Sequence, residues 1–328
     1  MEGGKGTVCV TGGTGYIGSW LIMRLLDHGY HVKTTVRSNP GHKKDLSFLT
    51  SLSGASEKLK IIEADLDDPE SFVIAVEGCV GVFHVATPID FENKEEEEIV
   101  TKRSIDGAIG ILKACVDSNT VKKVVYTSSS SAVILNGKDF DEMDETFWSD
   151  IDYVKSLKSN AASYMVSKTL TEKAVLEFSE KHDLLEVVTL IPPFVVGPFI
   201  CPKPPGSVFS VFNIIFGEKN QSSSMSCLDL VHVDDVARAH IFIFEHPEAK
   251  GRYNCSSNHT TVGNTFELLS TKCPKLQIPN KGSLFNMEGP KQPCLSSKKL
   301  LALGFEFKYG VEEMFDDAIK CCIEKGYL

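Results

Sequence analysis

Short apolar runs alternate with amphipathic stretches through the first part of the chain. Runs rich in valine and isoleucine occupy residues 7–12, 31–37, 58–66, 78–88 and 122–129, and the segments between them have helical spacing. Strands that helices cover on both faces are apolar along their whole length, without strict alternation. The rhythm therefore predicts an α/β fold built on a doubly wound parallel sheet.

Prolines interrupt this rhythm after a further apolar run at 185–191. Pro192 and Pro193 begin a proline-rich stretch that extends to residue 205, and the strand–helix alternation is lost there. Residues 227–246 again have the pattern of a turn into a helix, so we expect the chain to return to the first domain near them. The predicted division is residues 1–192 for the first domain, with that return, and residues 193–328 mainly for a smaller α/β C-terminal lobe that holds substrate.

Three glycines follow the first apolar run. Gly12, Gly15 and Gly18 precede a segment with the spacing of an amphipathic helix. Glycines at such a turn allow unusual backbone dihedrals, close approach of a pyrophosphate and close packing of the helix on the sheet. The N-terminus of the helix then faces the anion. Strand, glycines and helix together predict a Rossmann-type dinucleotide site.

The second apolar run ends at Arg37, where many NAD sites carry an acidic residue for the ribose hydroxyls. An arginine favours a 2′-phosphate instead, because its planar guanidinium can hold two phosphate oxygens at once. Lys44 adds a second positive charge nearby. The sequence therefore predicts NADPH/NADP⁺ as the cofactor.

Tyr164 and Lys168 lie four residues apart in a segment with helical spacing, so they share one face of a helix. The spacing alone is weak evidence, and it gains meaning from its place after the glycine turn and Ser129. A carbonyl that accepts a hydride becomes an alkoxide, which needs a proton and stabilisation of its charge. We expect Tyr164 to donate the proton, Lys168 to lower the pKa of Tyr164, and Ser129 to orient the carbonyl oxygen. The neighbouring serines 128, 130 and 131 stay open as alternatives to Ser129.

Composition narrows the class of protein. A net charge of −10 at pI about 5.4 argues against a nucleic-acid surface. Ten cysteines show no C-x-x-C spacing and no paired ligand histidines, so no metal site is predicted, and their scatter is typical of a reducing compartment. The sequence has neither a secretion signal nor an apolar stretch of about 18 residues for a membrane span. We expect a cytoplasmic protein.

The leading Thr11, the glycine spacing and the order of serine and Tyr-x-x-x-Lys resemble the extended short-chain dehydrogenase/reductases. Segments such as VCVTGGTGYIGSWLIMRLL and FKYGVEEMFDDAIKCCIEKGYL resemble its plant dihydroflavonol 4-reductase-like branch over essentially the whole chain. The resemblance implies a monomeric cytosolic reductase of flavonoid-type ketones, in which Lys168 holds the nicotinamide ribose. It also implies these cofactor contacts: Thr11, Gly12, Gly15, Tyr16, Ile17, Gly18, Arg37, Lys44, Asp65, Leu66, Ala86, Thr87, Pro88, Thr127, Ser128, Lys168, Pro192 and Val195.

The expected substrate side is apolar and aromatic, and consists of Pro88, Ile134, Phe199 and Phe209, with Phe212 and Phe216 in the same region. Dihydroflavonol 4-reductases carry a substrate-recognising Asn shortly after the serine, and this chain has Ile134 there. A buried substrate hydroxyl left unpaired costs about 1–3 kcal/mol, so an isoflavanone-like aromatic ketone is preferred to a dihydroflavonol. His232, before an aspartate-rich helix start, is expected first as a structural hydrogen-bond partner and second as a catalyst.

Three other functions stay open. An NADP-dependent alkaloid alcohol or carbinolamine dehydrogenase would share every residue named above. An NAD-dependent sugar-nucleotide epimerase would share the serine and Tyr-x-x-x-Lys chemistry, but Arg37 argues against its cofactor. A non-catalytic nucleotide sensor would keep the glycine turn and would have no need of Tyr164 and Lys168.

Overall fold

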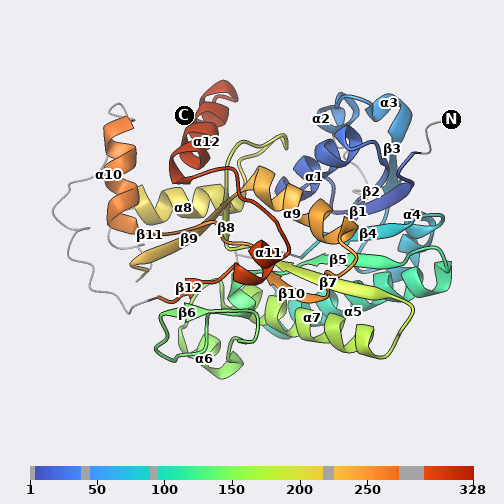
Figure 1. Ribbon diagram of the computed structural model, residues 1–328, viewed down its shortest axis with the longest axis horizontal. Coiled ribbons are helices and arrows are strands. Elements are labelled where there is room, and N and C mark those ends of the chain that lie inside the picture. Colours follow the sequence, from blue (N-terminus) through green and yellow to red (C-terminus); the bar gives the residue numbers. More distant parts are fainter. Residues whose placement is uncertain (1–3, 38–44, 89–94, 217–224, 273–291) are drawn as a thin grey trace.

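The computed structural model describes residues 4–37, 45–88, 95–216, 225–272 and 292–328 (Figure 1). Its main sheet has seven strands, all parallel, in the order β10-β7-β5-β4-β1-β2-β3. The predicted Rossmann-type parallel sheet is confirmed, and six of its strands lie in the apolar runs. The strands are β1 (Thr7–Thr11), β2 (His31–Val36), β3 (Leu59–Glu63), β4 (Gly81–His84), β5 (Lys123–Thr127), β7 (Glu186–Ile191) and β10 (Gly251–Asn254).

Helices cover both faces of this sheet (Figure 1). On one face α1 (Tyr16–Asp27) contacts α9 (Val233–Glu245), and on the other α5 (Glu97–Ser118) contacts α7 (Ala162–Glu180). Leu21 and Val236 are buried in the core of the first face, and Ile111 and Val175 in the core of the second. Helix α5 begins at Glu97, with Glu96 at its N-cap and the acidic Glu97 and Glu98 in its first turn. Two buried faces explain why the strands are apolar throughout.

The strand order reverses beside β1, which lies between β2 and β4. In an open parallel sheet, ligands bind outside the carboxyl ends of the strands at such a reversal. Three adjacent strands, β1, β4 and β5, end at this edge with Thr11, His84 and Thr127. The topology thus places the glycine turn and the serine segment after β5 at one end of the sheet.

A smaller lobe surrounds a second sheet, of order β11-β9-β8. Its strands are β8 (Phe194–Val196), β9 (Cys227–His232) and β11 (Asn258–Thr261). β8 and β9 share a buried core with three helices, and β11 pairs with β9: the helices are α8 (Gly206–Phe216), α10 (Val262–Lys272) and α12 (Val311–Glu324). Because α9 follows β9 directly and packs on the main sheet, the chain crosses between the lobes more than once. The predicted domain boundary at residue 192 remains a prediction.

A two-stranded parallel sheet pairs β6 (Glu142–Met143) with β12 (Cys294–Leu295). Leu295 and Met143 are buried in one cluster with Val133, and Ile134 packs against that cluster. The remaining elements are short: α2 (Ser47–Thr50), α3 (Ala55–Lys58), η1 (Pro69–Phe72), α4 (Val73–Val76), η2 (Ser130–Ala132), α6 (Ile151–Ser156) and α11 (Lys298–Ala302).

Of the helices that the structure describes, none is both long and apolar enough to cross a bilayer.

Candidate functional site

Glycines of the turn between β1 and α1 pack too closely against neighbouring atoms to carry a side chain. Gly12 has a φ of +73°, and a Cβ on Gly18 would lie 2.4 Å from the Gly12 carbonyl oxygen. Gly13, which the sequence analysis did not select, is as constrained, because its Cβ would lie 2.0 Å from Thr34 Oγ1. Gly15 is the extended N-cap of α1. These residues leave a backbone cradle at a helix N-terminus, which fits the pyrophosphate of a dinucleotide.

Thr11 joins this turn to the end of β4. Its hydroxyl accepts hydrogen bonds from the backbone N–H groups of Val85 and Ala86, at 3.1 Å each, and lies 2.8 Å from His84 Nδ1. Burial, helped by the charge of Lys168, lowers the pKa of His84 to about 3, so its imidazole is neutral. The Thr11 side chain therefore holds two strand ends together and sets Ala86 beside Gly12.

Tyr16 and Ile17 lie in the first turn of α1, and their side chains contact protein. The Tyr16 hydroxyl donates to the Gly197 carbonyl at 3.0 Å, and its ring packs against both lobes. Ile17 packs against the core of the main sheet. Tyr16 thus ties the glycine turn to the smaller lobe.

Arg37 and Asp65 come together from the ends of β2 and β3. Arg37 Nε lies 3.3 Å from Asp65 Oδ2, and the Arg37 side chain is 55% exposed. Asp65 also accepts from the backbone N–H of Asp67 at 3.2 Å, as a turn cap does. Leu66 is buried in the core against Gly107 of α5. Lys44 lies outside the described residues.

Lys168 is buried at the carboxyl end of β5. Its ammonium donates to the Thr127 carbonyl oxygen at 2.7 Å and to Thr87 Oγ1 at 3.2 Å, and lies 5.0 Å from the centre of the Tyr126 ring. Burial lowers the pKa of Lys168 to about 8, although Glu172 acts in the opposite direction. Thr127 itself bonds through Oγ1 to His240 Nε2 at 2.7 Å.

Tyr164, one helical turn before Lys168, is hydrogen-bonded to Ser129. Burial raises the pKa of Tyr164, and the Ser129 hydrogen bond only partly opposes this. The expectation that Lys168 lowers the pKa of Tyr164 is therefore wrong for this structure, because desolvation of the phenol dominates. The raised pKa keeps the phenol protonated, which is the form that an acid requires.

The four consecutive serines have different partners. Ser128 Oγ donates to Glu172 Oε2 at 2.6 Å, whereas the Ser131 hydroxyl donates to Ser129 Oγ at 2.9 Å. The Ser130 backbone N–H donates to the Pro192 carbonyl at 3.0 Å. Ser129 is thus the serine that is hydrogen-bonded to Tyr164, whereas Ser128 is bonded to Glu172.

A buried network around Glu172 was missed by the sequence analysis. Glu172 is fully buried one turn after Lys168, and it accepts from Ser128, from Thr189 Oγ1 at 2.7 Å and from Arg252 Nε at 2.9 Å. The Arg252 guanidinium stacks 3.6 Å from the centre of the Trp148 ring. The sequence feature that could have revealed Glu172 is the spacing Tyr-x-x-x-Lys-x-x-x-Glu, which puts three polar side chains on one face of α7.

The remaining predicted cofactor contacts fall into two groups. Ala86, Thr87, Pro88 and Lys168 line one small cavity together with Tyr126. Val195 is buried in β8, and its backbone exchanges hydrogen bonds with Ser207 Oγ at 2.8 and 2.7 Å. The first group is thus assembled around Lys168, and Val195 is part of the smaller lobe beside it.

The predicted substrate residues do not form one surface. Ile134 is half-buried on the loop that follows Ser129, whereas Phe209 is 60% exposed on α8. Phe199 is buried in a cluster with Cys201, Cys321 and Cys322, so its ring serves the core. Phe212 is stacked on Phe315, and the side chain of Phe216 lies outside what the structure describes.

His232 is a structural residue, as expected. It is the N-cap of α9, where its Nδ1 accepts from the Asp234 backbone N–H at 3.0 Å. Its ring stacks on Tyr309 with centroids 3.9 Å apart, and burial lowers its pKa. The contacts of His232 are therefore those of a residue that caps and positions helix α9.

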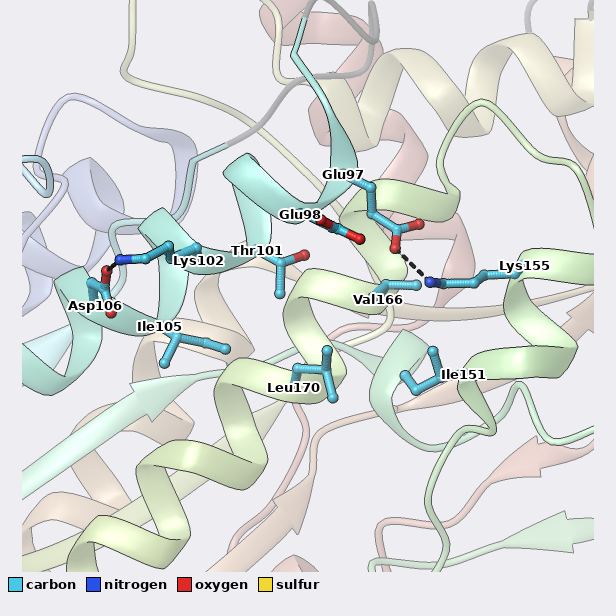
Figure 2. Close-up of a pocket in the computed structure, with 10 residues that line it drawn as sticks. All are labelled: Glu97, Glu98, Thr101, Lys102, Ile105, Asp106, Ile151, Lys155, Val166 and Leu170. Atoms are coloured by element: carbon cyan, nitrogen blue, oxygen red, sulfur yellow. Dashed lines mark hydrogen bonds and ion pairs between the residues drawn. The ribbon is translucent and has the colours of Figure 1, made fainter.

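A separate surface pocket of about 320 Å³ lies between α5, α6 and α7 (Figure 2). Ile105, Ile151 and Leu170 form its apolar part, and the ion pair of Glu97 with Lys155, at 3.0 Å, crosses its rim. None of the predicted site residues lines this pocket.

Comparison with known proteins places the chain among reductases. Residues 8–256 match the NAD dependent epimerase/dehydratase family. The chain is 56% identical to vestitone reductase from Medicago sativa over the full length of both. It is 48% identical to noscapine synthase from Papaver somniferum, covering all of this chain and 95% of the relative. It is 45% identical to dihydroflavonol 4-reductase from Callistephus chinensis, covering 98% and 88%. The resemblance predicted from the sequence is confirmed.

Solved structures agree with these matches. The crystal structure of the alfalfa vestitone reductase superposes with a TM-score of 0.88 at 54% identity, covering 99% of this chain and all of the other. A yeast methylglyoxal/isovaleraldehyde reductase in complex with NADPH gives a TM-score of 0.82 at 25% identity, covering 98% and 100%.

The Glu172 network generates a stability prediction. We expect Glu172→Gln to lower the free energy of unfolding by about 3–5 kcal/mol, because it leaves the buried Arg252 charge uncompensated. The measurement is equilibrium unfolding in urea. Glu177→Gln, at an exposed position of the same helix, is the matched control and should change little. Equal losses in the two variants would contradict the assignment.

Proposed function

Because the chain belongs to the NAD dependent epimerase/dehydratase family, we propose that it is an NADPH-dependent reductase of a bulky aromatic plant metabolite. Its substrate is an isoflavanone-like ketone, which it reduces to the alcohol. The observation that carries this proposal is the hydrogen bond of Tyr164 to Ser129 beside the buried Lys168. These groups are the proton donor, the orienting hydroxyl and the cation that carbonyl reduction requires.

The cofactor cradle supports NADPH. A Cβ on Gly12, Gly13 or Gly18 would clash with protein atoms. Without side chains at these positions, the backbone of the turn can approach a pyrophosphate closely. Arg37 is paired with Asp65 and 55% exposed at the end of β2, where its guanidinium would bind a 2′-phosphate. When bound, the nicotinamide supplies the hydride.

The catalytic roles follow from the contacts of the three side chains. Tyr164 is a neutral phenol and gives its proton to the carbonyl oxygen as negative charge develops there. Ser129 donates a hydrogen bond to the same oxygen and so fixes its orientation. Lys168 donates two of its three N–H groups to Thr127 and Thr87, and the third would bind a ribose hydroxyl of the cofactor.

The substrate class rests on the apolar character of the loop after Ser129. Ile134 offers no hydrogen bond to a substrate hydroxyl, which disfavours dihydroflavonols and suits an isoflavanone-like ring system. The higher identity to vestitone reductase than to noscapine synthase supports ketone reduction over alkaloid oxidation. An epimerase or a nucleotide sensor is disfavoured by Arg37 and by the assembled Tyr164 site, respectively.

We also propose that the protein is a monomer and that it is cytoplasmic, as the sequence predicts. The nine cysteines within the described residues are unpaired, which suits a reducing compartment.

The first test removes the proton donor. We expect Tyr164→Phe to lower kcat for NADPH-dependent reduction of an isoflavanone by about 10²–10⁴-fold, because general acid catalysis is lost. NADPH oxidation is followed by absorbance, and NADPH affinity by fluorescence should stay unchanged. Tyr327→Phe, at an exposed tyrosine, is the control. Wild-type turnover by Tyr164→Phe would refute the mechanism.

The second test concerns the 2′-phosphate. We expect Arg37→Asp to reduce the preference for NADPH over NADH in kcat/KM by about 10- to 100-fold, because charge-assisted hydrogen bonds contribute about 1.5–3 kcal/mol. Lys60→Asp makes the same charge change at an exposed position on β3 and should leave the preference intact. An unaltered preference in Arg37→Asp would exclude Arg37 from the cofactor site.

A further inference from the structure

Three side chains of different chemistry meet in the smaller lobe. Asp229 on β9, His259 on β11 and Cys294 on β12 each offer one ligand atom, and these atoms lie within 4.8 Å of one another. Within the described parts of the chain, this is the one cluster of three or more such residues. It is made by three strands that belong to two different sheets.

The backbone fixes two of the three positions. Asp229 and His259 are directly opposed in the antiparallel pair of β9 and β11, so their side chains share one face, with Asp229 Oδ1 3.0 Å from His259 Nδ1. Asp229 Oδ1 also accepts from the Leu295 backbone N–H at 3.3 Å, which brings the start of β12 to the carboxylate. This hydrogen bond orients the carboxylate from outside the cluster, as backbone groups around metal ligands do.

The ligand set selects the kind of metal. Thiolate, imidazole and carboxylate are together the ligands of Zn²⁺, whereas Mg²⁺ and Ca²⁺ prefer oxygen alone. The ligand atoms of a tetrahedral zinc lie about 3.5 Å apart. Asp229 Oδ1 and His259 Nδ1 are already about this close, and no separation in the cluster exceeds 4.8 Å, so a shift of about 1 Å brings the three atoms to the distances that zinc needs. His259 reaches the surface and Cys294 is half-buried, which gives the ion a way in.

We propose that Asp229, His259 and Cys294 form a zinc site with three protein ligands and a fourth position for water. The ion joins β9 and β11 to β12, and so fastens the last strand of the chain to the smaller lobe. Leu295, next to Cys294, packs in the cluster that supports Ile134 on the loop after Ser129. The sequence predicted no metal site because the ligands are 30 and 65 residues away from Asp229, with no local spacing to reveal them.

Cobalt(II) is the probe for this site, because a thiolate ligand gives it a charge-transfer absorption that free cobalt lacks. The full-length chain, freed of metal with a chelator, is titrated with CoCl₂. We expect a thiolate band that saturates at one cobalt per chain and disappears when ZnCl₂ is added. Cys294→Ser should abolish the band, and Cys227→Ser, at a half-buried cysteine on β9 outside the cluster, should keep it.

A second measurement uses the unaltered chain. At zinc concentrations about tenfold above Kd, we expect alkylation of Cys294 to slow by about tenfold, while Cys227 is modified at an unchanged rate, as followed by peptide mass spectrometry. The proposal is overturned if the wild type shows no thiolate band, if the band survives in Cys294→Ser, or if zinc leaves alkylation of Cys294 unchanged.

Discussion

The hydrogen bond from the Lys168 ammonium to the Thr127 carbonyl oxygen holds helix α7 against the carboxyl end of β5, and the catalytic geometry depends on it. Three successive turns of α7 bond to three consecutive residues at the end of that strand. Tyr164 bonds to Ser129, Lys168 to Thr127 and Glu172 to Ser128. One helix and one strand end therefore position the proton donor, the cation and the orienting hydroxyl, and the buried Arg252 charge compensates Glu172.

Burial sets the protonation states of this arrangement. It lowers the pKa values of Lys168 and His84, to about 8 and about 3, and it raises that of Tyr164. The same desolvation thus keeps the phenol as an acid and makes the ammonium easy to deprotonate. His84 stays neutral and holds Thr11, and with it the glycine turn. Lys168 is thus connected to the glycine turn through the end of β4, because it bonds to Thr87 while Thr11 bonds to the adjacent Ala86.

The periodicity of the sequence predicted most of the main sheet, because strands buried on both faces carry their signal in every residue. It also placed Gly12, Arg37 and Ser129 after strands whose carboxyl ends meet at one edge of a parallel sheet, and helix α7 carries Tyr164 to Ser129. It did not place Phe199, whose aromatic character suits a core as well as a pocket. Gly13 and Glu172 were missed because their constraints come from Thr34, Ser128 and Arg252, which are distant in sequence. Only the folded chain shows such contacts.

The catalytic geometry depends most on the burial of Lys168, and the pKa of the Lys168 side chain tests this burial directly. NMR titration of protein labelled in its lysine side chains follows each ammonium, and Lys168→Met identifies the resonance that belongs to this residue. We expect Lys168 to titrate at about 8, below the ordinary lysine value of 10.5. Titration near the ordinary value of 10.5 would contradict the account, because the ammonium would then be exposed to water rather than held between Thr127 and Thr87.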